Sequence, residues 1–506
     1  MPQLPIQRQE DFISGVVTNV NESIRPRNSV AFAMNMDFDH ELGAAVSRLG
    51  TGLINAQVVD GKTCLGLHNF RDSVGTGHKL FVAMNIANDA TSSVYDAETG
   101  SAVTGATGLT ASTKIRFLTY LDSCLMINGV DAERAWNGAA IITTGGAFDL
   151  GNIPGSNALK YAIEWQDRVY LAGDTAAGAS DRVYYSSTPT ASAVSWTSGN
   201  GNFDLEPEDG GGTITGFGKV PGYLLIFKER SMKRFNFVSA FPETLDQIGT
   251  PSQASVITAQ GICAFFSASS REAKGFYITN GGRPISISHD RAKSIKKWVD
   301  AIPQAYEDDV SGWGNERYFY WSIGDVTVDG IAYTNVVLKY HRGLDQWSIR
   351  SYPSEFRYFS SFVSSGNNVL VGGDDDGCVI EIDKASTYQD YNPATAASVP
   401  IHWEVRTHDE DFRYYNIKNV SESVVVNSRG AQGARVQMAT DQSVEGNYYD
   451  RLKNVGEITK DYSELTLKEA LKGSRFSTTI KGFQIGNRAT IKGIEFPNVE
   501  VLPNYK

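Results

Sequence analysis

The sequence predicts an all-β protein, a β-propeller of six to eight blades followed by a C-terminal β-sandwich-like domain. Short runs rich in Val, Ile, Tyr, Phe and Trp, bounded by Gly, Asn, Asp and Ser, are typical of half-buried strands. These runs recur at intervals of roughly 42 to 55 residues, the size of a four-stranded propeller blade. From about Ile401 the pattern changes to longer alternating strands. No WD or kelch signature accompanies the repeat, so the blade number stays between six and eight.

Each repeat is centred on one strongly apolar strand, and in several repeats a second strand follows within about ten to twenty residues. Such a unit is a meander that cannot bury both of its faces alone, so neighbouring units must stack. The central strands begin at Lys79, Ser123, Asp167, Tyr223, Gly275, Arg317 and Asn367.

Three regions follow from these patterns. Residues 1–60 form an entry segment that contributes to ring closure or docking, and its later part is expected to supply an outer strand. Residues 61–390 form the propeller, and residues 391–506 form the β-sandwich-like domain. A helix is expected within 290–302, where apolar residues have helical spacing before Pro303. A further one or two helical turns are expected at 465–471, ended by Gly473.

Composition excludes several classes of protein. Among 506 residues, 41% are hydrophobic and 20% charged, values typical of a folded globular protein. No apolar run approaches the length of a membrane span, and the polar start lacks the apolar core of a signal peptide, so secretion by that route is not expected. The net charge of −11 argues against a general nucleic-acid binder. Four widely spaced cysteines predict buried, reduced thiols rather than disulfides or a metal site: Cys64, Cys124, Cys263 and Cys378.

Three acidic segments are the candidate channel or docking loops. The first precedes a run of three glycines and contains Glu206, Glu208 and Asp209; the second contains Asp374, Asp375 and Asp376; the third contains Asp409, Glu410 and Asp411. Consecutive aspartates followed at once by a strand favour a tight hairpin at 374–376 over a calcium loop. For the other two segments, a solvated outer loop and a channel lining both fit the sequence.

The sequence predicts no enzyme, no cofactor and no metal site. The seven histidines are scattered, and none has zinc-ligand spacing. Ser288, His289 and Asp290 are contiguous, whereas the members of a catalytic triad are brought together from separate parts of a fold. Four tryptophans are expected to pack between neighbouring sheets rather than to stack on sugars: Trp165, Trp313, Trp321 and Trp347.

Three stretches of the chain resemble the tail nozzle and packaged-DNA-stabilising proteins of short-tailed bacteriophages. The end of the chain, 473–500, is similar to the closing strands of that family. The entry segment carries, in order, Gly15, Asn19, Pro26, Asn35, Gly43, Arg48 and Gly50. The passage out of the repeats carries Asp374, Gly377 and Asp383, then Tyr388 and Asp390, with Ile380 where the family usually has an aromatic residue.

The resemblance implies a structural virion protein of the phage tail, assembled in the host cytoplasm. Such a protein forms a ring, usually a homohexamer, below the portal and adaptor proteins at the head-tail connector. The ring retains packaged DNA and lets it pass at ejection without sequence-specific binding. Tail fibre or spike proteins are the further partners that the family implies. The alternative is a carbohydrate-binding or carbohydrate-degrading propeller of a phage tail, which the abundant aromatic residues also fit.

Overall fold

The computed structural model describes residues 7–9, 11–18, 25–26, 28–55, 57–75, 77–154, 159–174, 179–206, 210–237, 241–289, 294–364, 366–408, 410–411, 418–440, 453–473, 475–484, 487–496 and 499–502. Strands dominate this part of the chain, and its helical structure is limited to α1 (Lys296–Asp300) and short 3-10 turns, including η2 (Gln253–Ser255), η3 (Gln304–Asp309) and η4 (Pro393–Thr395). The all-β prediction is therefore confirmed. Among the described residues, no helix has the length and apolar character needed to cross a membrane.

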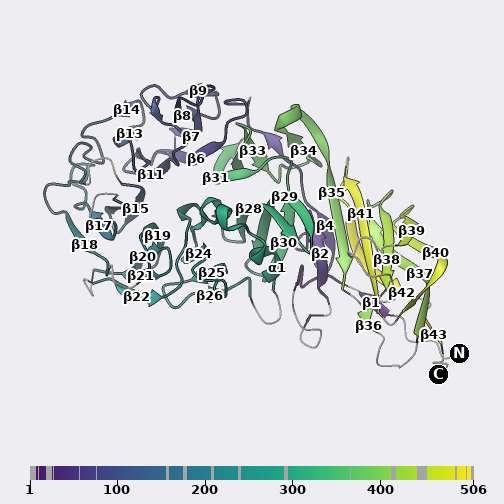
Figure 1. The fold of residues 1–506 in the computed structure, drawn as a ribbon. Helices are drawn as coiled ribbons and strands as arrows, with labels where there is room; N and C mark the ends of the chain where they lie inside the picture. Colours follow the sequence, from purple (N-terminus) through teal and green to yellow (C-terminus); the bar gives the residue numbers. More distant parts are fainter. Residues whose placement is uncertain are drawn as a thin grey trace.

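Small antiparallel sheets make up the region between residues 52 and 382, and they follow one another along the chain (Figure 1). The first three sheets contain β6 (Cys64–Arg71), β7 (His78–Asn85), β8 (Thr91–Asp96), β9 (Ser101–Ala102) and β10 (Leu109–Thr110); β11 (Arg116–Tyr120), β12 (Ser123–Ile127), β13 (Arg134–Trp136) and β14 (Ile141–Ile142); and β15 (Tyr161–Trp165), β16 (Arg168–Ala172), β17 (Arg182–Tyr185) and β18 (Gly201–Asp204).

Four further units of four strands continue the series. They contain β19 (Ile214–Val220), β20 (Tyr223–Lys228), β21 (Met232–Phe235) and β22 (Glu243–Asp246); β23 (Ile257–Ala259), β24 (Ile262–Ser267), β25 (Gly275–Thr279) and β26 (Ile285–Ser286); β27 (Ser311–Gly314), β28 (Tyr318–Val328), β29 (Ile331–His341) and β30 (Gln346–Ser351); and β31 (Phe356–Ser364), β32 (Asn367–Asp374), β33 (Val379–Ile382) and β5 (Gly52–Leu53).

The position of a strand within its sheet explains its sequence. Side chains alternate between the two faces of a strand, so a strand that is apolar throughout must be covered on both faces. The second strands have this character: every residue of β12 is buried, and in β20 all but the first are. The fourth strands β14, β18 and β22 are half-buried or exposed. Burial therefore decreases from the second to the fourth strand in these units, whereas the fourth strand β30, which also pairs with β2, is buried.

Tight two-residue turns connect the first and second strands of several units. Leu121 and Asp122 both have positive φ, as do Gln166 and Asp167. Positive φ at both central residues defines the turn whose twist matches that of a β-hairpin. The two residues of each turn therefore set the register of the hairpin between the first and second strands.

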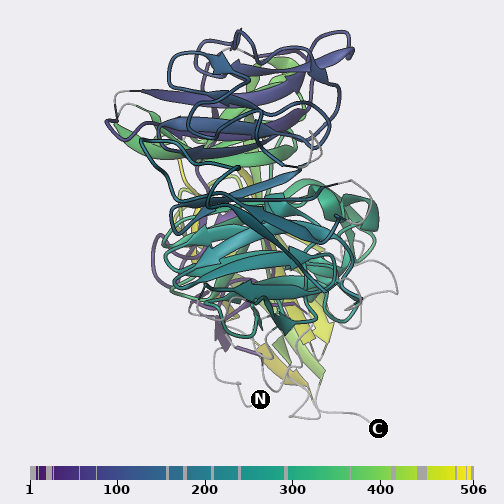
Figure 2. The same cartoon turned by 90° about the vertical axis from the view of Figure 1, so that its left-hand side faces the viewer.

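The first strands of successive units contact one another in chain order, from β6 through β11, β15, β19, β23 and β27 to β31, and β31 contacts β6. The last unit takes its fourth strand from the other end of the chain, because Leu53 in β5 pairs with Ile380 in β33. The later part of residues 1–60 thus supplies an outer strand, as expected. Figure 2 shows the small sheets from the side that lies at the left in Figure 1.

Two large sheets combine both ends of the chain. One contains β3 (Met36–Asp37), β4 (Ala45–Ser47), β42 (Thr490–Phe496), β37 (Lys418–Arg429) and β40 (Tyr462–Gly473), joined by β1 (Gln7–Gln9) and β43 (Val499–Leu502). The other continues from β30 through β2 (Val30–Met34), β35 (Ala397–Thr407) and β41 (Arg475–Gln484) to β38 (Arg435–Thr440) and β39 (Lys453–Glu457); β34 (Gln389–Asn392) and β36 (Glu410–Asp411) pair with β35 and β41.

The two large sheets share one buried apolar core. Val405 and Ile480 from one sheet and Val426 and Ile494 from the other belong to the same cluster, and all four are almost completely buried. The second sheet is also continuous with the small sheets, since Met34 in β2 pairs in parallel with Ile349 in β30. The C-terminal strands are therefore joined to the repeat region by backbone pairing.

The two helix expectations have opposite outcomes. The structure has α1 at Lys296–Asp300 inside the expected 290–302, with Trp298 and Val299 buried; residues 290–293 lie outside the described residues. The helical turns expected at 465–471 are wrong, because this segment belongs to the strand β40. Pairing of Leu465 with Val424 in β37 overrides the helix propensity of its Leu, Lys, Glu and Ala residues.

Candidate functional site

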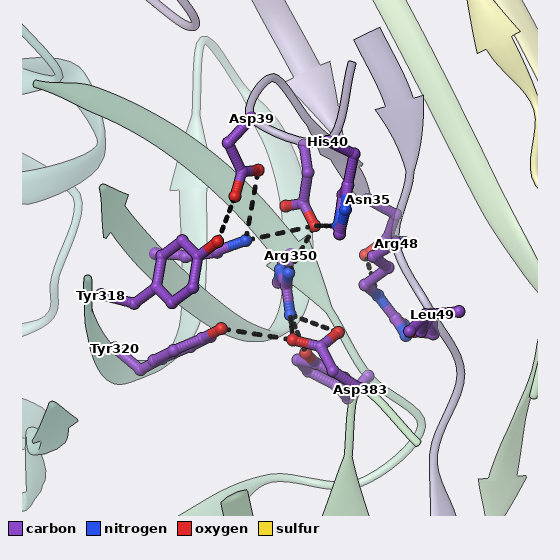
Figure 3. A network of polar contacts seen from close by, with 12 residues as sticks. Asn35, Asp39, His40, Arg48, Leu49, Tyr318, Tyr320, Arg350 and Asp383 are labelled. Atoms are coloured by element: carbon purple, nitrogen blue, oxygen red, sulfur yellow. Dashed lines mark hydrogen bonds and ion pairs between the residues drawn. The ribbon is translucent and has the colours of Figure 1, made fainter. Parts of the chain in front are cut away.

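Buried charges gather where the entry segment meets β29, β30 and the chain leaving β33 (Figure 3). Arg350 in β30 is fully buried. Its guanidinium donates to Asp37 at 2.6 Å and to Asp383 at 2.8 and 2.9 Å. Because Asp37 lies in β3 and Asp383 directly follows β33, one side chain connects three segments that are far apart in the sequence.

A second cation extends this group of charges. The Lys339 ammonium lies 3.3 Å from Asp37 and 3.5 Å from Asp39, and 4.2 Å from the centre of the Tyr318 ring. Tyr318 donates its hydroxyl hydrogen bond to Asp39. Tyr320 donates to Asp383 at 3.2 Å. Two tyrosine hydroxyls of β28 thus donate hydrogen bonds to carboxylates that Lys339 and Arg350 also contact.

Arg48 forms a second buried ion pair beside the first. Its guanidinium donates to both carboxylate oxygens of Asp390, at 2.8 and 2.5 Å. It also donates to the Asn35 side-chain oxygen at 2.9 Å and to the Ser351 carbonyl at 2.8 Å. The guanidinium carbon lies 4.2 Å from the centre of the Tyr352 ring. Arg48 thereby connects the entry segment to the end of β30 and to β34.

The buried groups keep their charges because opposite charges outweigh burial. Burial works to raise the pKa of Asp37, but Arg350 and Lys339 hold this pKa well below its usual range. The pKa of Asp383 is lowered against the effect of burial, mainly by Arg350. Burial works to lower the pKa of Arg350, and the two aspartates raise it well above its ordinary value. A buried charge without such partners would be strongly destabilising.

We name this set the junction network: Asn35, Asp37, Asp39, Arg48, Tyr318, Tyr320, Lys339, Arg350, Asp383 and Asp390. Within the described part of the chain, the one group of three side chains spaced to hold a metal ion is Asp37, Asp39 and His40. Lys339 and Arg350 already neutralise these carboxylates at contact distance. The arrangement is suited to fastening chain segments together.

The acidic segment at 206–209 is only partly described. The Glu206 side chain is exposed, and its carboxylate accepts a hydrogen bond at 3.2 Å from Lys233 in β21. Glu208 and Asp209 lie outside the described residues. Glu206, which follows β18, thus forms an ion pair with Lys233 of β21.

The structure confirms the tight hairpin at 374–376, between β32 and β33. Asp374 is fully buried, and its carboxylate accepts hydrogen bonds from the backbone N–H of Cys378 at 2.7 Å and the Ser354 hydroxyl at 3.0 Å. Asp375 accepts from the Glu355 N–H at 3.0 Å, and Asp376 is half-buried. Asp374 therefore stabilises the turn and presents no carboxylate to a channel.

The third acidic segment lies in the C-terminal region. Asp409 lies outside the described residues, while the backbones of Glu410 and Asp411 form β36 and pair with β41. The described residues of the three acidic segments lie at different places: Glu206 follows β18, 374–376 lie between β32 and β33, and 410–411 form β36, so these described residues do not form one site.

Several residues that carried the family resemblance do meet at the junction network. Asn35, Arg48, Asp383 and Asp390 are members of it. Gly50 lies beside it, and an added Cβ there would be 2.0 Å from the carbonyl oxygen of Gln389. Residues up to 355 positions apart in the sequence thus have one shared structural role.

Sequence reasoning missed Asp37, Lys339 and Arg350. The available signal was a charge within an otherwise apolar strand, as for Lys339 in β29 and Arg350 in β30, where both side chains are buried. A buried charge requires a partner. The identity of that partner depends on the tertiary structure.

Ser288 and His289 do not form a catalytic arrangement. The Ser288 hydroxyl lies 2.7 Å from His289 Nδ1, but Ser288 is fully buried and its oxygen accepts the Phe276 N–H. The other ring nitrogen of His289 faces the Lys296 ammonium at 3.2 Å. A triad places a carboxylate there; Asp290 lies outside the described residues.

The predicted packing of the tryptophans and cysteines is confirmed. Trp165, Trp321 and Trp347 are almost completely buried. The indole N–H of Trp321 donates to the backbone carbonyl of Ser255 in η2, and that of Trp347 donates to the carbonyl of Ile287, directly after β26. Trp313 is half-buried. All four cysteines are buried and free.

Fold and site together define an all-β protein of small antiparallel sheets fastened to two large sheets by buried ion pairs. Neither a family model nor a curated protein sequence matches the chain.

Proposed function

We propose that the small sheets form a seven-bladed β-propeller, with β5 completing the last blade, and that the two large sheets form the β-sandwich-like domain. The circular series of contacts among the first strands, from β6 to β31 and back to β6, supports this proposal. So does the exposure gradient from inner to outer strands, which is typical of blades stacked around an axis.

We further propose that the protein is a structural virion protein of a phage tail, without enzymatic turnover. It forms a ring of six copies, the number that the family resemblance implies, and acts as a nozzle below the portal and adaptor. The observation that carries this proposal is the convergence of Asn35, Arg48, Asp383 and Asp390 on the junction network, in the order that the resemblance requires.

Such a network suits a component that must withstand mechanical force. Retaining packaged DNA requires that the propeller and the C-terminal domain transmit force without separating. A buried ion pair is costly to break, because each separated charge stays desolvated. The junction network places several such pairs where the entry segment, β30 and β34 meet.

The DNA channel of the ring would lie between copies of the protein. Within one copy, η3 crosses the region between the first strands: Asp309 pairs with Lys114 at 2.6 Å and with Arg357 at 3.4 Å. A pocket of about 380 Å³ beside these residues is far too small for a duplex. The net charge of −11 would give the channel an acidic wall that repels phosphate and lets DNA slide.

Ring assembly would use a heterologous interface that closes by rotation. Adaptor and portal proteins above, and a tail fibre or spike at the side, are the partners proposed for the loops at the rims of the sheets.

Electron microscopy of the purified protein and of virions tests the proposal. We expect six- or twelvefold rings in negative stain and the same protein in the tail by antibody labelling and mass spectrometry of purified virions. A stable, functional monomer that is absent from virions would overturn it.

A further inference from the structure

We propose that a groove on the outward face of the sheet containing β35 and β41 binds an uncharged oligosaccharide. The groove has a volume of about 520 Å³, within the range of roughly 300–1,000 Å³ found for small-molecule sites. This site goes beyond the proposed nozzle function and lies mainly on the C-terminal strands of the large sheet, with Tyr333 of β29 at its border.

The strand register defines the floor of the groove. Glu404 in β35 pairs with Lys481 in β41, Lys481 with Arg435 in β38, and Arg435 with Glu457 in β39. Side chains of directly paired residues lie on the same face of a sheet. At 4.7–4.9 Å between strands, this row of four charges spans roughly 14 Å.

The opposite face of these strands is occupied by the core. Val405, Ile480 and Val436 alternate with the floor residues and are completely buried. The floor residues are half-buried or exposed. The row therefore faces away from the core and is open to a ligand.

Aromatic rings flank this floor. Phe483 in β41 lies two residues beyond Lys481 on the same face; it is 63% exposed and makes an edge-to-face contact with His402 at a centroid distance of 4.2 Å. Tyr333 of β29, which also lines the groove, packs on Phe32 at 5.7 Å and on Trp298 at 5.0 Å. The exposed ring of Phe483 is held by His402 and offers a flat apolar surface.

The charges of the floor select the class of ligand. Two carboxylates and two cations sum to zero, with Arg435 lying 3.9 Å from Glu457. A polyanion such as DNA would gain no net attraction from this row, and neither would a polycation. The row offers both acceptors and donors within reach of one bound molecule.

An oligosaccharide matches these features better than a peptide does. Its hydroxyl groups both donate and accept along its length, and the C–H faces of its rings can stack on Phe483 and Tyr333. An extended peptide uses its backbone hydrogen bonds at a sheet edge, whereas this groove lies on a sheet face.

Binding to an array of uncharged hexose and N-acetylhexosamine tri- and tetrasaccharides tests the proposal with the full-length protein. Hits are then titrated by saturation-transfer NMR beside trialanine and a short DNA duplex. We expect at least one uncharged saccharide to bind and the peptide and DNA not to compete. Absence of any saccharide hit, or binding of trialanine or DNA at this groove, would overturn the proposal.

Substitution of the exposed ring separates stacking from simple burial. Phe483→Leu should weaken saccharide binding about tenfold, because it removes the aromatic face on which the sugar ring stacks; a tenfold change corresponds to about 1.4 kcal/mol. Phe483→Trp should retain it. Phe241→Ala removes another ring that is 76% exposed and should change nothing. If Phe483→Leu and the wild-type protein bound the saccharide equally well, the saccharide would bind elsewhere and the proposed groove would be wrong. Circular dichroism verifies that each variant is folded.

Discussion

Removing Arg48 should separate the entry segment from the structure that it fastens. In Arg48→Met, the Asp390 carboxylate loses both of its contacts to the guanidinium and stays 3% exposed. Asn35 and the Ser351 carbonyl each lose a donor, and Tyr352 loses the stacked cation. Breaking a buried ion pair by removing one partner costs about 3–5 kcal/mol, and we expect a loss of this size in the free energy of unfolding.

A surface pair of the same geometry provides the control. Arg182 donates to both carboxylate oxygens of Asp204 at 2.6 and 3.0 Å, but both side chains are well exposed to solvent. Solvent screens such pairs, so Arg182→Met should leave the unfolding transition almost unchanged. Comparison of the two variants isolates the effect of burial.

Urea unfolding followed by tryptophan fluorescence measures the loss, and hydrogen exchange locates it. Because a chain of this size can unfold in parts, exchange should accelerate first at Asn35 and Ser351, whose N–H groups are bonded across the junction. The double variant Arg48→Met/Asp390→Leu should recover part of the loss, since it leaves no unpaired charge. Equal destabilisation by Arg48→Met and Arg182→Met would refute the reasoning.

Three further predictions concern the repeat region. Burial raises the pKa of Asp374 to about 7, so between about pH 4 and 7 this side chain is deprotonated in the unfolded chain and protonated in the folded one. The free energy of unfolding should therefore fall by roughly 4 kcal/mol as the pH rises over this range. The same pH series on Asp374→Asn should lack this decrease. In urea unfolding, Gly377→Ala should lower the free energy of unfolding much more than Gly222→Ala. Both glycines have φ near +84°, but only at Gly377 would an added Cβ collide with a backbone carbonyl, that of Val59. Equal losses in the two variants would contradict this prediction. Iodoacetamide should not label the four buried thiols of the native protein, Cys64, Cys124, Cys263 and Cys378, but should label all four in guanidinium. Mass spectrometry measures the labelling, and rapid labelling of the native protein would contradict the prediction.

Local sequence patterns were sufficient where local structure decides the outcome. The apolar runs centred on β12 and β20 predicted buried strands, because a strand covered on both faces must be apolar throughout. The aspartates at 374–376 predicted a hairpin, and Asp374 caps it. The buried cysteines and tryptophans followed from their place in these apolar runs.

The segment 465–471 shows where this reasoning stops. Its Leu, Lys, Glu and Ala residues favour a helix in isolation. Leu465 and Leu467, two residues apart, also fit a strand, and this was the signal for the observed β40. Pairing with β37 decides between the two, and that pairing joins residues about 40 positions apart.

The sequence by itself determined the central strands of the repeats, the hairpin at 374–376 and the all-β class, because alternation and turn chemistry act over a few residues. Only the tertiary structure decided how the ends of the chain join the repeats: β5 pairs with β33, and β2 lies between β30 and β35. It also decided which charges pair. Arg48 meets Asp390 and Arg350 meets Asp37 across more than 300 residues, because a buried charge takes the partner that the folded chain brings within contact distance.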